Sequence, residues 1–245
     1  MSDKDAIYSQ PLEAIADFSF DEKVVQVFPD MIQRSVPGYS TIIAMTGVMA
    51  ARYAQTDSNC YDLGSSLGAS TLSTRQQFEH SPQQPKQIIA VDNSTAMLQR
   101  CQQIIDEDKS STTVNLVEGN IQDVDIKNAS VVVLNFTLQF IDRAERKALL
   151  NKIYQGMLKG GILILSEKFC FDDEHLQTLN TDLHHSFKRA NGYSDMEVSQ
   201  KRSALEKVLL PETINTHQQR LNNAGFSSND VWFQCFNFAS LVAIK

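Results

Sequence analysis

Residues 59–78 read NCYDLGSSLGASTLSTRQQF: a short apolar stretch, a glycine turn, and then a helical pattern. The apolar stretch ends at Gly64, where glycine permits a sharp turn from strand to helix. The pattern then repeats, because QIIAVD at residues 87–92 is a second apolar stretch and a helix is expected from Ser94 to about residue 106. Strands that alternate with helices in this way predict a parallel sheet with right-handed crossovers.

The alternation continues toward the carboxyl end of the chain. Further strands are expected at 113–117, 129–136 and 162–166, with a helix at 143–158 that Lys159-Gly160-Gly161 should end. Residues 231–236 and 238–244 follow each other too closely for a crossover, so they predict an antiparallel hairpin at one sheet edge. The expected fold class is α/β, a doubly wound and mostly parallel seven-stranded sheet with a terminal β-hairpin and helical additions. It is similar to the class I S-adenosylmethionine-dependent methyltransferase fold.

The helical additions are expected within one domain that spans residues 1–245. Residues 1–55 contribute an N-terminal arm and two helices. The sequence leaves open whether residues 1–20 form an ordered arm or a loose leader. Residues 172–210 are helical and polar and are expected to form an insertion before the last helix, at 212–224.

The charge of the chain bears on its partners. Lysine and arginine number 22 against 29 aspartate and glutamate residues, a net charge of −7. Such a surface repels phosphate backbones, so direct nucleic-acid binding is not expected and a small-molecule substrate is favoured. With 42% hydrophobic residues, the chain is also unlike disordered proteins.

The cysteines and the apolar stretches indicate a cellular location. The four cysteines, Cys60, Cys101, Cys170 and Cys235, are scattered, without a CxxC or Cys/His cluster. This argues against a metal site and against a disulfide framework. No apolar stretch reaches the length of a signal peptide core or of a membrane helix. A soluble, cytoplasmic protein is therefore expected.

Doubly wound sheets bind ligands at the carboxyl ends of their strands. The first such end carries Gly64, Ser65 and Ser66, followed by a helix whose first N–H groups are free to bind a ligand. Asp92 follows Asp62 by 30 positions, at the end of the next strand. An acid there can accept hydrogen bonds from both ribose hydroxyls. Asp92 could also simply begin the following helix, and the two roles are compatible.

The glycine turn distinguishes between two nucleoside ligands. A nicotinamide dinucleotide needs the pattern G-x-G-x-x-G, so that its pyrophosphate can approach the loop. Residues 64–68 read GSSLG and lack the middle glycine. A bulkier loop suits S-adenosyl-L-methionine, which has no pyrophosphate and whose amino-acid tail would lie against the turn. The terminal hairpin also favours this ligand over a dinucleotide.

Two further strand ends add candidate residues. Asn120 and Ile121 follow the third strand, at a position that resembles the adenine pocket of the methyltransferase-like fold. Asn135 follows the fourth strand, where the sulfonium end lies in that fold. Its side-chain amide offers both a donor and an acceptor. Alternatively, the Asn135 amide satisfies nearby backbone groups.

Five segments occur together in a fixed order: VPGY at 36–39, DLGSSLG at 62–68, DNS at 92–94, LNFTLQF at 134–140 and SQKRS at 199–203. On these segments the chain resembles the carboxy-S-adenosyl-L-methionine synthase family over nearly its full length. The likeness is specific, because generic methyltransferases would share only the glycine turn and the acid that ends the second strand.

The resemblance implies an unusual reaction. S-adenosyl-L-methionine is the substrate whose methyl group is carboxylated, prephenate supplies the carboxyl group, and phenylpyruvate leaves. The product, carboxy-S-adenosyl-L-methionine, serves a partner enzyme that gives tRNA wobble uridine its 5-oxyacetic acid form. A conventional methyltransferase acting on a small molecule or tRNA, and a non-catalytic S-adenosylmethionine-binding partner, are the alternatives.

The resemblance also implies a set of ligand-binding residues. They are Tyr39, Gly64, Ser65, Ser66, Asp92, Asn93, Asn120, Ile121, Asn135 and Arg202. Arg202 is implied to reach the carboxylate of the product from the neighbouring subunit of a homodimer. No side chain is identified as a catalytic base, and no metal is expected.

Other charged residues receive no functional role. His184-His185, with His175 nearby, are interpreted as a solvated helix face, and Lys188-Arg189 as ordinary surface charge.

Overall fold

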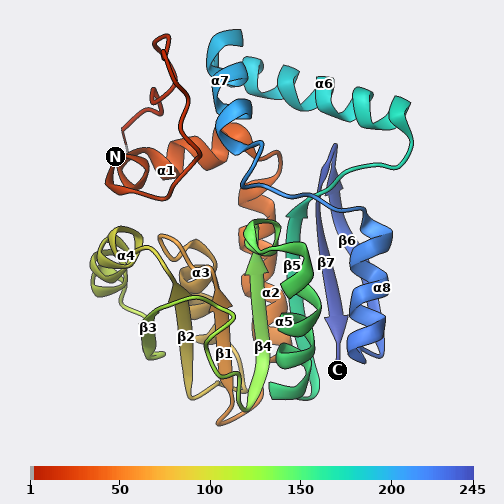
Figure 1. Ribbon diagram of the computed structural model, residues 1–245. Helices are drawn as coiled ribbons and strands as arrows, with labels where there is room; N and C mark the ends of the chain where they lie inside the picture. Colours follow the sequence, from red (N-terminus) through yellow and green to blue (C-terminus); the bar gives the residue numbers. More distant parts are fainter. Residues whose placement is uncertain (1–2) are drawn as a thin grey trace.

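One mixed sheet organises the protein (Figure 1), whose computed structural model describes residues 3–245. The strands are β1 (Asn59–Leu63), β2 (Gln87–Asp92), β3 (Val114–Glu118), β4 (Ala129–Asn135), β5 (Met157–Lys168), β6 (Ser228–Cys235) and β7 (Phe238–Ile244). Their order in the sheet is β3-β2-β1-β4-β5-β7-β6. The first five strands pair in parallel, and β7 is antiparallel to both β5 and β6. The predicted doubly wound sheet with a terminal hairpin is thereby confirmed.

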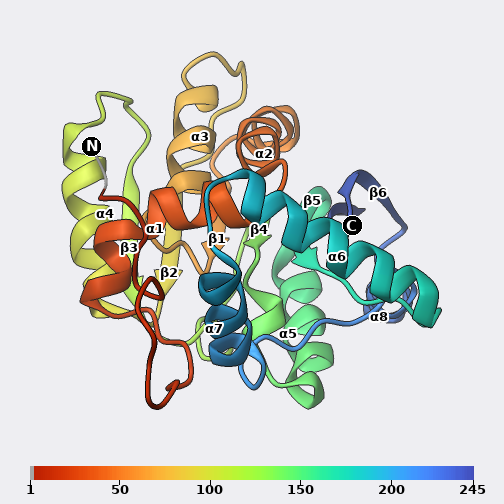
Figure 2. The ribbon, with the colours of Figure 1, turned by 90° about the horizontal axis from the view of Figure 1, so that it is seen from above.

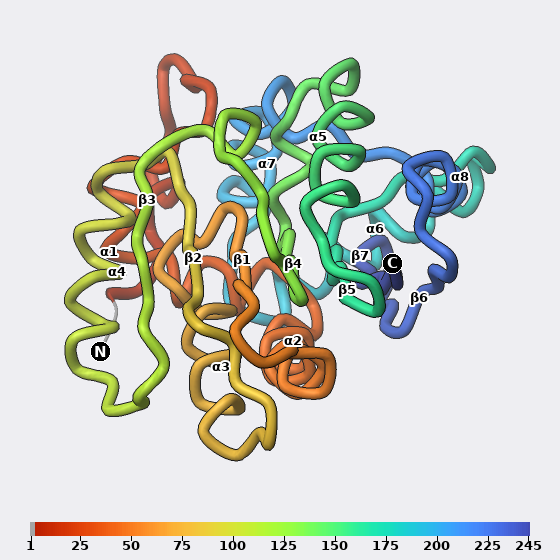
Figure 3. Tube along the Cα trace, turned by 90° about the horizontal axis from the view of Figure 1, so that it is seen from below, coloured from red at the N-terminus to blue at the C-terminus, as the bar shows by residue number. Residues whose placement is uncertain are grey.

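Helices cover both faces of this sheet. They are α1 (Glu22–Ser35), α2 (Tyr39–Tyr53), α3 (Ala69–Phe78), α4 (Thr95–Glu107), α5 (Arg143–Gly156), α6 (Glu174–Ala190), α7 (Asp195–Leu205) and α8 (Ile214–Ala224), with a short 3-10 helix η1 (Leu138–Phe140). Helices α2 and α3 lie on one face, and α5 and α8 on the other (Figure 3). Each face has a separate apolar core, because alternate strand residues point to opposite sides.

A further layer lies above the carboxyl ends of the strands (Figure 2). It consists of α1, α6 and α7 together with the arm formed by residues 3–20. The arm has no regular secondary structure but is bound to α7, where the Gln200 side chain accepts from the Leu12 amide at 2.9 Å and donates to the Tyr8 carbonyl at 3.0 Å. The arm is therefore ordered, which the sequence left open.

The boundary between α5 and β5 differs from the prediction. The helix ends at Gly156, and Lys159-Gly160-Gly161 lies inside β5, so the predicted stop at the glycine pair was wrong. A Cβ on Gly156 would come within 2.1 Å of the Ile126 carbonyl oxygen, so this close approach requires glycine. The chain then pairs at once with β4, and the helix cannot continue.

Candidate functional site

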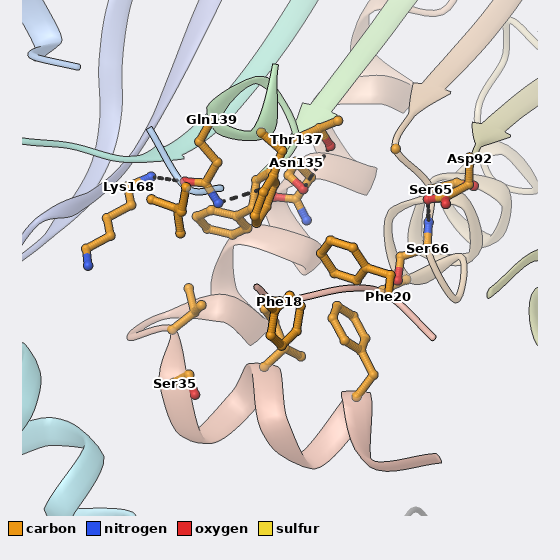
Figure 4. Close-up of a pocket in the computed structure, with 18 of the residues that line it drawn as sticks. Phe18, Phe20, Ser35, Ser65, Ser66, Asp92, Asn135, Thr137, Gln139 and Lys168 are labelled. Atoms are coloured by element: carbon orange, nitrogen blue, oxygen red, sulfur yellow. Dashed lines mark hydrogen bonds between the residues drawn. The ribbon is translucent and has the colours of Figure 1, made fainter. Parts of the chain in front are cut away.

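A cavity of about 580 Å³ lies at the carboxyl ends of the strands, under the layer formed by the arm, α1, α6 and α7 (Figure 4). The strand order reverses between β1 and β4, and this reversal is the expected ligand position in a doubly wound sheet. The volume is within the range of roughly 300–1,000 Å³ that is typical of small-molecule sites. Among the predicted ligand-binding residues, all except Arg202 line the cavity.

Backbone hydrogen bonds to the neighbouring strand hold the turn after β1. The amides of Gly64 and Ser65 both donate to the Val91 carbonyl, at 2.8 and 2.9 Å. Gly64 has φ +84°, and a Cβ there would lie 2.3 Å from the Thr137 hydroxyl oxygen, so glycine is required. These amides are thus not available to a ligand. The Ser65 Oγ is instead buried without a hydrogen-bond partner in the described part of the chain, which leaves a polar atom for a ligand.

Asp92 has the structural one of its two predicted roles, because it holds the start of α4. Its Oδ1 accepts from the Ser94 amide at 2.9 Å, at the start of α4, and its Oδ2 accepts from the Ser66 amide at 2.8 Å. Burial raises the pKa of Asp92, while these hydrogen bonds oppose the shift. Asp92 lines the cavity, and each carboxylate oxygen can accept a further hydrogen bond, so acceptor capacity remains for a ligand.

The adenine-side candidates adjoin Asp92. The Asn93 side chain donates to Asn120 at 3.2 Å, and Asn120 donates in turn to Asp123 at 3.2 Å. Ile121 is buried beside them and offers an apolar surface. The residues after β2 and β3 therefore form one end of the cavity.

Tyr39 and Asn135 also line the cavity. Burial raises the pKa of Tyr39, whose ring centroid lies 6.3 Å from that of Phe136. Asn135 Oδ1 is buried and has no hydrogen-bond partner among residues 3–245. This oxygen does not satisfy nearby backbone, contrary to the alternative interpretation, and an unpaired buried acceptor favours a ligand donor at this position.

The turn that follows Asn135 is held by Glu167, which sequence reasoning missed. The two carboxylate oxygens of Glu167 accept from the amides of Leu138 and Gln139, at 2.9 and 2.8 Å. Burial raises the pKa of Glu167 to about 8. Phe136 has φ +60°, a conformation that is rare for residues other than glycine. Glu167 therefore fixes a strained turn at the centre of the site.

Two residues of α6 at the far end of the cavity differ from the sequence interpretation. His184 and Lys188 are buried and line the cavity. The predictions of a solvated face for His184 and of ordinary surface charge for Lys188 were therefore wrong, whereas His175 and Arg189 are exposed. His184 bonds the Ser35 carbonyl through Nε2 at 2.8 Å. Burial, with the nearby lysines, lowers the pKa of His184 to about 2, so the ring is neutral and Nε2 donates. Helix α6 crosses above the strand ends and turns this polar face inward.

Arg202 lies on α7 and is exposed, outside the cavity of its own chain. Its neighbour Lys201 is buried and lines the cavity. Lys168, at the carboxyl end of β5, lines the same end and was also missed. Lys168 could have been identified from the sequence, because doubly wound sheets bind ligands at the carboxyl ends of their strands. No local sequence signal distinguishes Lys188 or Lys201 from the other lysines of polar helices.

Residues 3–245 contain no group of three or more histidine, cysteine or acidic side chains that is placed to hold a metal ion. Within the same residues, every helix is too short or too polar to span a membrane.

Comparison with known proteins gives close relatives along the whole chain. A methyltransferase domain family matches residues 61–161. The carboxy-S-adenosyl-L-methionine synthase of Aliivibrio fischeri is 59% identical over 245 residues, covering 100% of both chains. The enzymes of the same name from Salmonella paratyphi C and Escherichia coli K12 are 57% and 56% identical, each covering 100% of this chain and 98% of its own.

Solved structures share the fold at low identity. Human N-acetylserotonin methyltransferase, solved in complex with S-adenosylmethionine, has a TM-score of 0.62 and 16% identity, covering 91% of this chain and 55% of its own. A putative S-adenosylmethionine-dependent methyltransferase from Methanococcus maripaludis has a TM-score of 0.58 and 18% identity, covering 96% and 97%.

Proposed function

The chain belongs to the carboxy-S-adenosyl-L-methionine synthase family, and from this premise we propose that it carboxylates the methyl group of S-adenosyl-L-methionine with prephenate as the carboxyl donor. The observation that carries the proposal is a single cavity with two different ends. The end at Asp92 and Asn120 suits a nucleoside, and the end at Lys168 and Lys188 suits an anion. A methyl-transfer site has no general need for the second end.

The nucleoside end fits S-adenosyl-L-methionine. Asp92 would bind the ribose hydroxyls, while Asn93, Asn120 and Ile121 would surround the adenine. Gly64, Ser65 and Ser66 would face the amino-acid tail, where the unpaired Ser65 Oγ supports a polar contact. Tyr39 and Asn135 would lie beside the sulfonium, and the unpaired Asn135 Oδ1 could accept a weak C–H hydrogen bond from the polarised methyl group.

The proposed reaction needs no base from the protein. Loss of the ring carboxylate of prephenate as carbon dioxide makes the ring aromatic and expels its hydroxyl group as hydroxide, which leaves phenylpyruvate. Hydroxide removes one proton from the methyl group, which the sulfonium makes acidic, and becomes water. The resulting carbanion forms a bond to carbon dioxide and yields carboxy-S-adenosyl-L-methionine. The substrate thus supplies its own base.

The proposal extends to the domain organisation, the assembly and the use of the product. Residues 1–245 would act as one S-adenosylmethionine-binding domain, in which the arm, α1, α6 and α7 form the layer above the cavity. The enzyme would be a cytoplasmic homodimer in which Arg202 reaches the site of the partner subunit. Its product would pass to an enzyme that modifies the tRNA wobble uridine.

The first prediction tests the reaction itself. Purified protein given prephenate and S-adenosyl-L-methionine should form carboxy-S-adenosyl-L-methionine and phenylpyruvate, and should do so after chelator treatment. Mass spectrometry of the mixture measures both products. With S-adenosylhomocysteine, which lacks the methyl group, no carboxylated product should appear. Activity lost with chelator and restored by a metal would contradict the metal-free reaction.

A second prediction concerns Arg202. A guanidinium can bind a carboxylate through two parallel hydrogen bonds, whereas lysine offers a point charge. Arg202→Lys should therefore weaken binding of the carboxylated ligand by roughly tenfold or more, as expected when a charged hydrogen bond is lost. Affinity for plain S-adenosyl-L-methionine should change little. Calorimetric titrations with both ligands measure this difference.

Arg100→Lys, at an exposed position on α4, is the matched control for this substitution. Equal losses for the two ligands would refute a role in carboxylate binding. Light scattering checks the dimer, and a monomer that still prefers the carboxylated ligand would refute the contribution across subunits.

A further inference from the structure

Three lysines from different elements meet at the end of the cavity opposite Asp92. Lys168 ends β5, Lys188 is on α6 and Lys201 is on α7, and all three line the cavity. Figure 4 shows Lys168 and Asp92 at the two ends of the site. Lys188 is 6% exposed and Lys201 is 5% exposed, so this end is largely shielded from solvent.

The positive charges at this end outnumber the negative ones. Lys201 Nζ lies 3.4 Å from Asp5 Oδ2 and donates to Ser35 Oγ at 3.1 Å. Within the described residues, neither Lys168 Nζ nor Lys188 Nζ has a hydrogen-bond or ion-pair partner. Asp30 also favours the charged form of Lys201 and Arg34 opposes it. Two carboxylates therefore face three ammonium groups and one guanidinium. Burial, with the neighbouring charges, lowers the pKa of Lys168 to about 8 and that of Lys188 to about 7.

Cations that are shielded from solvent and lack a counter-ion destabilise a fold, and apolar residues of similar size would pack here at lower cost. The cluster is therefore explained by an anion that enters the cavity. Neighbouring groups do not supply that anion. His184 is neutral, and the exposed Arg202 adds a further positive charge that contributes to the lowered pKa of Lys168.

Position in the sheet distinguishes between two sources of the anion. The amino-acid tail of S-adenosyl-L-methionine is assigned to the turn after β1. Lys168 ends β5, which is two strands away in the order β1-β4-β5. At about 4.8 Å per strand spacing, the separation along the sheet is roughly 10 Å. The cluster is thus displaced from the tail carboxylate of the cofactor and lies on the side of the second substrate.

The second substrate carries two carboxylates with opposite requirements. The carboxylate that departs as carbon dioxide loses its charge, so an ammonium group bound to it would stabilise the ground state and slow the reaction. An apolar surrounding favours the loss of charge. The cavity offers such a surface in Phe20, Phe136 and Phe140. The other carboxylate keeps its charge and can be bound without this penalty.

We propose that Lys168 and Lys188 bind the carboxylate that the second substrate retains, the one on its 2-oxo acid side chain, and so direct the departing carboxylate to the aromatic part of the cavity. This inference rests on the proposed function. It assigns the orientation of the second substrate to two lysines at the end of the cavity opposite Asp92.

The test is a titration in a complex that cannot react. Protein saturated with S-adenosylhomocysteine is titrated with prephenate, and separately with phenylpyruvate, which carries only the retained carboxylate. Lys168→Met and Lys188→Met should each weaken both ligands by a similar factor of roughly tenfold or more, because a charged hydrogen bond is lost. S-adenosylhomocysteine affinity should stay unchanged. Lys147→Met, at an exposed lysine on α5, is the control.

The titrations distinguish the proposed role of the two lysines from two other roles. A loss for prephenate with unchanged phenylpyruvate binding would mean that the lysines hold the departing carboxylate, and an equal loss for S-adenosylhomocysteine would assign them to the cofactor tail. Either result, or absence of binding to wild type, overturns the inference. If binding follows the predicted pattern but the wild-type protein forms no carboxylated product from S-adenosyl-L-methionine and prephenate, that result would contradict only the proposed function. Thermal melting confirms folding, since replacing an unpaired buried charge by methionine should not lower the melting temperature.

Discussion

Replacement of Arg146 by methionine should lower the free energy of unfolding by about 3–5 kcal/mol, as expected when a buried ion pair loses one partner. Arg146 is 0% exposed and forms an ion pair with Glu212. It also donates to the carbonyls of Ile141 at 3.0 Å and Leu210 at 2.8 Å. One guanidinium thus joins α5, the turn after β4, and the segment before α8. Methionine fills similar space but leaves both carbonyls without this donor, and Glu212 keeps only its second ion pair, with Arg220 at 2.7 Å.

Urea unfolding measures this loss, and the melting temperature should fall by roughly 6–20 °C for a chain of this size. Arg143→Met is the control, because Arg143 is exposed on the same helix. Its effect should stay within about 0.5 kcal/mol. A loss below about 1 kcal/mol for Arg146→Met would contradict the expected cost of leaving buried acceptors without a donor.

Asp92→Ala should reduce affinity for S-adenosyl-L-methionine by roughly a hundredfold or more. Each hydrogen bond from a ribose hydroxyl to the carboxylate is worth ~1.5–3 kcal/mol, and two such bonds would be lost. The substitution also removes the acceptors for the Ser66 and Ser94 amides. The protein should nevertheless fold, because the carboxylate lies at the cavity end of its strand.

Calorimetric titration measures the affinity, and a melting curve without ligand separates it from stability. Asp106→Ala, at an exposed position on α4, should bind as the wild type does. Asp92→Asn keeps the size of the side chain and removes its charge, so it should lie between the two. Unchanged affinity in Asp92→Ala would exclude ribose binding by this residue.

The sequence predicted the sheet well, because strand and helix patterns alternate clearly from residue 59 to residue 168. The error at the start of β5 has a simple cause. A glycine pair at 160–161 is typical of a helix end, but the close contact between Gly156 and Ile126 ends α5 earlier. That contact joins segments 30 residues apart, and no local pattern reports it.

The candidate site was predictable only where it follows strands. Gly64, Asp92, Asn120 and Asn135 each occur at or just beyond a strand end, and the structure brings them to one cavity. The buried face of α6 was not predictable. A helix whose polar residues point inward has the same sequence pattern as one whose polar residues face water, and only tertiary packing above the strands tells them apart.

The position of β7 inside the sheet affects the chain while it is being made. β7 pairs with β5 on one side and with β6 on the other. During synthesis, the outer edge of β5 has no partner until β7 emerges from the ribosome, about 76 residues later. At ~5–20 residues per second, this delay lasts roughly 4–15 s. For that time an apolar strand with unpaired backbone groups is exposed to other nascent chains. Slower translation of residues 169–237 should therefore increase aggregation and the demand for chaperones.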